Sequence, residues 1–216
     1  EAGKAYSEEF LCIFDHAYLL HDFLPSPTQT PVWELATNLD ANDQVAVFCS
    51  FSKVTFGGGG LAFATAGKKL FDLLSRQRAS MIVCSDKVNQ MRHLEFLKDR
   101  AGVLEHMKKH AEIVRPKFEV AFDALDVLSP EIGAYHKPTG GYFISYDTKR
   151  PIAKRVIKLC KEVGVLITPA GSTYPHFHDP LDSNIRLAPT FLGVEDLQDA
   201  MEVFVTAIMI AHQELD

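Results

Sequence analysis

The chain has 216 residues, 47% of them hydrophobic, which is enough to bury the core of one or two domains. Its 22 basic and 28 acidic side chains give a formal net charge of −6, which argues against a general nucleic-acid-binding or anionic-membrane-binding surface. No apolar stretch approaches the length of a membrane span, and residues 1–9 lack the basic and apolar regions of a signal peptide. We therefore expect a cytoplasmic protein with no nucleic-acid or membrane partner.

Short apolar runs alternate with amphipathic patterns in the first half of the chain. The apolar runs predict strands at residues 10–14, 45–48 and 61–66, of which the first two read as buried strands. Apolar spacing predicts helices at residues 67–80 and 87–99, and Thr30 followed by Pro31 is typical of the start of a helix that ends near residue 38. A longer helix is predicted from about residue 103 to 127, with Pro116 as a candidate kink.

The second half of the chain has a different pattern. Strands are predicted at residues 142–146, 165–167 and 184–188, and helices at residues 151–163 and 194–212. Few strands covered by helices are typical of a small α+β unit. We place the domain boundary inside the long helix, with one domain at residues 1–115 and the other at residues 116–216.

The cysteines and the paired histidines predict neither disulfides nor a metal site. The cysteines lie far apart, each in or beside an apolar segment, which favours buried free thiols in a reducing compartment. His176 and His178 have no third ligand near them in the sequence, so a solvated loop is the better interpretation. The cysteines are Cys12, Cys49, Cys84 and Cys160.

Lys53 carries the strongest chemical signal. It follows the apolar run at residues 45–48 and the hydroxyls of Ser50 and Ser52, and it precedes four glycines, Gly57 to Gly60. A lysine that leaves a buried strand loses hydration, which favours the neutral amine that forms Schiff bases with pyridoxal phosphate (PLP). Hydroxyls and bare loop amides suit a phosphate. The segment alone also fits a solvated lysine beside a flexible loop. It does not match a nucleotide-binding motif, because the glycines precede a strand rather than a helix and no Gly-Lys-Ser/Thr follows them.

Three further side chains have chemistry that complements this lysine. Asp15 stands at the end of a predicted strand, where open α/β sheets place their ligands, and Tyr18 follows three residues later. Arg186 lies between apolar residues that indicate partial burial. Taken singly, these residues also fit a helix-capping aspartate, a core tyrosine and a structural, ion-paired arginine.

In order and spacing, these motifs resemble the fold-type I PLP-dependent aminotransferases. The resemblance rests on Asp15-x-x-Tyr18, Ser50-Phe51-Ser52-Lys53, Gly140-Gly141-Tyr142-Phe143 and Asn184-Ile185-Arg186-Leu187-Ala188-Pro189. The MocR-like branch, which includes a bacterial subgroup of aspartate aminotransferases, is more similar still. That closer similarity rests on Asp15-His16-Ala17-Tyr18-x-x-His21, Thr168-Pro169-Ala170-Gly171 and Asp179-Pro180-x-Asp182-x-Asn184-Ile185-Arg186.

The resemblance implies a role for each cofactor-binding residue. Lys53 would form the Schiff base with PLP and then move the proton between the substrate Cα and the cofactor. Asp15 would pair with the protonated pyridine nitrogen, and Tyr18 would donate to the phenolic oxygen of the ring. Ser50 and Ser52 would approach the phosphate.

The resemblance also implies that Arg186 binds the substrate α-carboxylate through a bidentate contact. Two features of the chain differ from the family pattern. Many members have a phosphate-binding arginine where this chain has Leu61, so Thr55 and the amides of Gly57–Gly60 are candidates to replace it. The glycine-containing phosphate loop, the aromatic that stacks on the ring and an asparagine to the ring oxygen have no counterpart before Asp15, so the chain looks like the later half of such an enzyme.

The implied fold class is α/β, namely the PLP-dependent transferase fold, with the later part of the large-domain mixed sheet followed by a smaller α+β C-terminal domain. The implied function is a ping-pong aminotransferase acting on an amino acid and a 2-oxo acid, with aspartate and 2-oxoglutarate as first candidates. We expect a homodimer, in which residues 81–97 reach toward the neighbouring site. Two alternatives stay open: a PLP-binding effector domain of a MocR-type transcription regulator without turnover, and a non-catalytic aminotransferase-like fragment.

Overall fold

The computed structural model describes residues 2–7, 9–25 and 31–216. The chain divides into two units, Glu1–Lys109 and His110–Asp216. This division and the boundary expected from the sequence both fall within one continuous helix, α5 (Arg100–Leu125), which runs through Pro116. Thr30, the expected first residue of the helix-start signal, lies outside the described residues.

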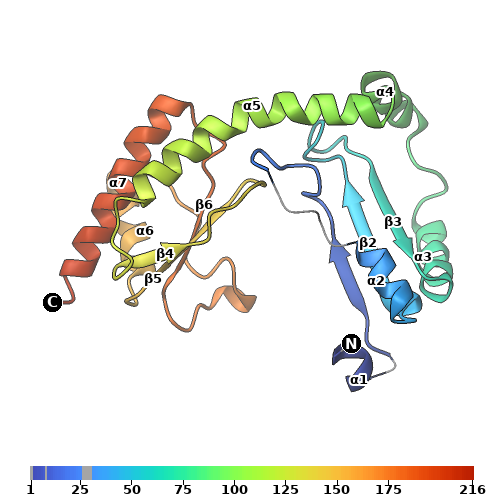
Figure 1. Ribbon diagram of the computed structural model, residues 1–216, viewed down its shortest axis with the longest axis horizontal. Coiled ribbons are helices and arrows are strands. Elements are labelled where there is room, and N and C mark those ends of the chain that lie inside the picture. The colour runs from blue at the N-terminus through green and yellow to red at the C-terminus, as the bar shows by residue number, and fades with distance from the viewer. Residues whose placement is uncertain (1, 8, 26–30) are drawn as a thin grey trace. The chain divides into compact units, whose positions relative to one another are not determined.

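The first unit is built on a three-stranded sheet (Figure 1). Its elements are α1 (Ala2–Tyr6), β1 (Cys12–Asp15), α2 (Val32–Asn38), a 3-10 helix (Asn42–Gln44), β2 (Val45–Ser50), β3 (Ala62–Ala66), α3 (Lys68–Met81), α4 (Lys87–Leu97) and the first part of α5. The strand order is β1-β2-β3, with β1 and β2 parallel and β2 and β3 antiparallel. Because β1 and β2 are parallel, Asp15 and Ser50 end their strands at the same edge of the sheet.

The strands and helices expected in this unit are present close to their predicted positions, but the expected burial of the first strand is wrong. In β1, Ile13 is 64% exposed and Phe14 is 37% exposed, and in β2 only Val45 and Ala46 are buried. An apolar pattern indicates which residues gain from burial, whereas burial itself requires a covering element. The described residues of this unit leave that part of β1 uncovered.

The second unit has an antiparallel sheet backed by helices. Its elements are the rest of α5, β4 (Gly133–Tyr135), β5 (Ile144–Thr148), α6 (Ala153–Glu162), a 3-10 helix (Pro175–Phe177), β6 (Asn184–Leu187) and α7 (Val194–Gln213). The strand order is β4-β5-β6. Burial alternates along β5, where Ile144 and Tyr146 are buried and Ser145 is exposed, so one face of the sheet packs on the core. Phe118 from α5 and Phe204 from α7 complete that core.

Three expectations for the chain need correction. Residues 165–167 form no strand, and β5 begins at Ile144 rather than at residue 142, because Gly141 has a positive φ of 86° and turns the chain just before it. The cysteines are free, but only Cys160 is buried. Cys84 is exposed because it follows the end of α3, in a segment that lacks regular secondary structure.

Candidate active site

Five of the six expected site residues lie in the first unit, around the edge of the sheet where β1 and β2 end. Asp15 pairs in register with Phe48, and the backbone continues this pairing because His16 N–H donates to the Phe48 carbonyl at 2.7 Å. The Asp15 carboxylate accepts the Ala17 N–H at 2.9 Å. It therefore closes the turn that leads to Tyr18 while its side chain remains exposed.

Lys53 and Tyr18 are brought together at this edge. The Lys53 amine lies 5.0 Å from the centroid of the Tyr18 ring, within the range of a cation–π contact. Lys53 is exposed and Tyr18 is half-buried, so the amine lies over one face of an anchored ring. The two side chains come from different segments, and sheet pairing between β1 and β2 is what makes them neighbours.

The hydroxyls of Ser50 and Ser52 form a compact pair. Ser50 Oγ donates to Ser52 Oγ at 2.7 Å, and Ser52 N–H donates to Ser50 Oγ at 2.9 Å. Gly60 lies directly against this pair, because a Cβ atom there would come within 2.5 Å of Ser52 Cα. Only a glycine fits at this position without displacing Ser52. Thr55 is engaged differently, since its hydroxyl donates to the Phe51 carbonyl at 3.0 Å.

Arg186 belongs to the second unit. It lies on β6 opposite Ser145 of β5, and its guanidinium stacks on the Phe143 ring at 4.8 Å. Its Nε is buried and has no hydrogen-bond partner among the described residues. The described residues form no salt bridge with Arg186, so they do not support the interpretation of Arg186 as a structural, ion-paired arginine. A buried guanidinium N–H without an acceptor is costly, which makes this side chain a candidate anion site.

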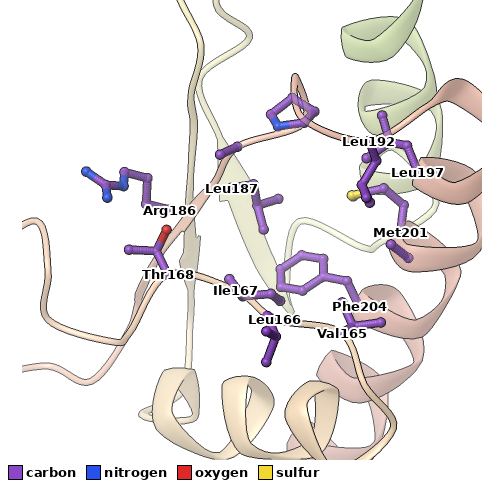
Figure 2. A pocket seen from close by; sticks show the side chains of 13 residues that line it. Val165, Leu166, Ile167, Thr168, Arg186, Leu187, Leu192, Leu197, Met201 and Phe204 are labelled. Atoms are coloured by element: carbon purple, nitrogen blue, oxygen red, sulfur yellow. The ribbon is translucent and has the colours of Figure 1, made fainter. Parts of the chain in front are cut away.

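A mainly apolar cavity of about 120 Å³ lies beside β6. Figure 2 shows Leu187, Met201 and Phe204 gathered around it, and Arg186 and Thr168 also line it, although the Arg186 guanidinium is directed away from that group. Successive residues of a strand face opposite sides, so Arg186 and Leu187 must diverge in this way.

A buried polar network around Asn184, for which the sequence motifs implied no role, supports the strand that carries Arg186. The Asn184 side chain is buried and fully engaged: its amide donates to Ser145 Oγ and to Asp147 Oδ1, both at 2.8 Å, and it accepts from Thr173 Oγ1 at 2.6 Å. Its position two residues before Arg186 means that these contacts fix the start of β6. The motif at residues 179–186 is the sequence signal that could have indicated this support.

Asp179 caps the same segment. Its buried carboxylate accepts the backbone N–H groups of Leu181, Ser183 and Asn184 at 2.8–2.9 Å. Burial alone would raise the pKa of Asp179, but these hydrogen bonds to the charged form outweigh it and hold the pKa below its ordinary value. The charged carboxylate is therefore part of the folded structure of this loop.

We predict that Asp179→Asn lowers the free energy of unfolding by about 1–3 kcal/mol at pH 7, because an amide accepts these N–H groups less strongly and at fewer positions. A depressed folded pKa gives stability that is present above the unfolded pKa of about 3.9 and is lost as pH falls through the folded value. The difference between wild type and variant should therefore shrink between pH 5 and pH 2 in urea titrations. Asp199→Asn, on the exposed side of α7, is the matched control. A difference that is constant across this range would contradict the prediction.

The described residues lack the features of a metal site and of a membrane-spanning helix. Within residues 2–7, 9–25 and 31–216, no cluster of three or more His, Cys, Asp or Glu side chains could hold a metal ion, and His176 and His178 are exposed. Among the same described residues, no helix has both the length and the apolar character needed to cross a membrane.

The chain is similar in sequence and in fold to known aminotransferases. An aspartate aminotransferase from Corynebacterium glutamicum is 34% identical over 216 residues, which is 99% of this chain and 50% of that protein. The crystal structure of an aspartate transaminase from the same organism has a TM-score of 0.90 at 33% identity, covering 95% of this chain and 49% of that chain. The structure of an α-aminoadipate aminotransferase from Thermus thermophilus, complexed with N-(5′-phosphopyridoxyl)-L-leucine, shares the fold with a TM-score of 0.78 at 24% identity, covering 97% of this chain and 53% of that chain.

The chain spans about half the length of the curated relatives it matches. Its architecture is the mixed α/β arrangement of the PLP-dependent aminotransferase fold, as expected from the sequence motifs. A family model described as aspartate amino-transferase matches residues 2–215. The chain therefore belongs to the aspartate amino-transferase family.

Proposed function

We propose that the full-length protein is a PLP-dependent aminotransferase that moves an amino group between an amino acid, with aspartate as first candidate, and 2-oxoglutarate. The observation that supports this most is the contact of the Lys53 amine with the Tyr18 ring, 5.0 Å from its centroid, at the sheet edge that also carries Asp15. PLP, when bound, supplies an electron sink for the carbanion at the substrate Cα. Membership of the family supports the proposed reaction, and the similar Corynebacterium proteins, which are named as aspartate aminotransferases, support aspartate as the first substrate to test.

The residues present fit this cofactor. The Ser52 hydroxyl, which accepts from Ser50 Oγ at 2.7 Å, could donate to a phosphate, and the Ser50 hydroxyl could do so in place of its bond to Ser52. Gly60 keeps side-chain atoms away from both. The Lys53 amine would hold PLP covalently and, once released by substrate, take the proton from the substrate Cα. Because position 61 is a leucine rather than the arginine of the family pattern, phosphate binding at this edge would depend on neutral hydrogen-bond donors.

Asp15 and Tyr18 would hold the ring in its reactive electronic state. The Asp15 carboxylate would keep the pyridine nitrogen protonated, and the Tyr18 hydroxyl would donate to the ring oxygen. In the second unit, Arg186 would bind the substrate α-carboxylate. The supporting observation is that its buried Nε has no hydrogen-bond partner among the described residues.

We predict that Asp15→Ala lowers kcat more than it weakens PLP binding. An opposite charge at hydrogen-bond range shifts a neighbouring pKa by about 1–3 units, so losing it should cost roughly 10- to 1000-fold in kcat. Asp15→Glu, which keeps the charge, should be milder than Asp15→Asn. Stopped-flow turnover and PLP titration of each variant measure both effects, and a near-normal rate for Asp15→Asn would remove Asp15 from the site.

We also propose that the protein belongs to the MocR-like branch and acts as a homodimer. The apolar side chains of Met81, Val83, Val88 and Met91 are each more than 60% exposed, which leaves residues 81–97 available for a subunit contact. Asn89 is committed within its own unit, because its side-chain amide donates to the Gly59 carbonyl at 2.6 Å. A fully active monomer in sedimentation analysis at assay concentration would contradict the homodimer.

Two measurements on the full-length protein test the proposed function. The absorbance spectrum of protein mixed with PLP should show a new visible band, and an assay with aspartate and 2-oxoglutarate should show transamination. A band without turnover on any amino acid would favour a PLP-binding effector domain of a MocR-type regulator. The absence of both would favour a non-catalytic aminotransferase-like protein.

A further inference from the structure

The turn that carries Lys53 is held by imidazole side chains from three other segments of the first unit. His21 Nε2 lies 3.1 Å from the Lys53 carbonyl oxygen, His106 Nε2 lies 2.6 Å from the Val54 carbonyl oxygen, and His93 Nε2 lies 2.9 Å from Thr55 Oγ1. Three consecutive residues thus each receive a contact from a histidine. The proposed function assigns a role to none of these histidines.

His21 differs from the other two because it also contacts Tyr18. Its backbone N–H donates to the Tyr18 carbonyl at 3.1 Å, and its ring meets the Tyr18 ring edge to face, with centroids 5.3 Å apart. With the contact to the Lys53 carbonyl, this one residue links the two segments whose side chains form the Lys53–Tyr18 pair.

The contact with the Lys53 carbonyl determines which nitrogen of the His21 ring carries the proton. The side chain is only 3% exposed, and burial lowers the pKa of His21, so the imidazole is neutral near pH 7. A carbonyl oxygen can only accept, and the proton must therefore be on Nε2. A neutral, buried donor of this kind holds the Lys53 backbone in place, while the Lys53 side chain itself is exposed.

We infer that His21 is a positioning residue for Lys53: by donating from Nε2 to the Lys53 carbonyl while contacting Tyr18, it sets the place of the amine relative to the Tyr18 ring. This inference rests on the proposed function for its catalytic consequence. Its structural part, the ordering of the turn at residues 51–55, does not depend on PLP or turnover.

Hydrogen exchange at two backbone amides measures the order of the turn at residues 51–55. The Val54 and Thr55 amides both donate to the Phe51 carbonyl at 3.0 Å, so their hydrogen exchange measures how often the turn opens. In the full-length protein without added PLP, His21→Leu should speed exchange of these two amides about fivefold to tenfold, with no change at the β2 amides. His21→Gln, whose side-chain amide can donate to the same carbonyl, should restore much of the protection. His136→Leu, at an exposed site of the second unit, is the matched control.

The catalytic consequence is measured separately. A misplacement of about 1 Å can cost on the order of 100-fold, so His21→Leu should lower kcat by about 10- to 100-fold with KM within about threefold, and His21→Gln should recover most of kcat. Unchanged exchange at Val54 and Thr55 in His21→Leu, an equal rise across β2, or no recovery in His21→Gln would each overturn the inference. If wild type shows no transamination, the proposed function fails, whereas the exchange data still decide whether His21 holds the turn.

Discussion

Replacing Lys53 with alanine in the full-length protein is expected to abolish transamination, with a loss of at least about four decades in kcat. One side chain is proposed to act both as the covalent attachment point and as the proton carrier, and general acid–base catalysis alone contributes about 10²–10⁴-fold. Non-covalent binding of PLP should persist, because the proposed phosphate contacts come from Ser50 and Ser52. Rapid-reaction kinetics with aspartate and 2-oxoglutarate measure the first effect, and equilibrium dialysis with PLP measures the second.

The covalent attachment itself can be located by borohydride reduction followed by peptide mapping. The reduced adduct should be found on Lys53 in wild type and should be absent in Lys53→Ala. Lys68→Ala is the matched control, because Lys68 lies in the same unit but is exposed and forms an ion pair with Asp72 on the surface of α3. Trapping of PLP on any other lysine of the wild-type protein would remove Lys53 from its proposed role.

Most of the longer helices and strands were predictable because each has a local signal, whereas α1 and β4 were not predicted. The apolar run at residues 45–48 predicted β2, and the helical spacing at residues 194–212 predicted α7. What failed depended on tertiary contacts. Val165 and Ile167 line the cavity beside α7 without pairing to a strand, and β4 has only three residues, too few to show a period.

The candidate site was predictable only as a set of chemically suited residues. The sequence motifs indicated Lys53 and Tyr18 as candidates. It is the parallel pairing of β1 with β2, however, that brings the Lys53 amine close to the Tyr18 ring. The contact of His21 with the Lys53 carbonyl joins positions 32 residues apart, and no local sequence pattern indicates a contact over that distance. The buried Nε of Arg186, which has no hydrogen-bond partner in the described part of the chain, is likewise a result of packing rather than of the sequence around it.

The Arg186→Lys variant is expected to raise KM for the amino acid and for the 2-oxo acid alike and to slow kcat. An ammonium group makes a single-point contact, whereas the guanidinium fork can bind both oxygens of a carboxylate and fix the substrate in one orientation. Lysine also lacks the planar group that stacks on Phe143 at 4.8 Å. Losing one partner of a buried charge pair costs about 3–5 kcal/mol, which corresponds to roughly two to four decades in kcat/KM.

The design of this experiment separates two roles for the same arginine. The kcat/KM is measured for aspartate, alanine and an aromatic amino acid in wild type and in Arg186→Lys. The α-carboxylate is common to all three substrates, so the proposed role requires a uniform loss. Arg155→Lys, at a surface ion pair with Glu214 in the same unit, is the matched control and should lose little, because exposed pairs contribute about 0–1 kcal/mol. A loss confined to aspartate would make Arg186 the residue that binds the substrate side chain, and the α-carboxylate would then require another cation.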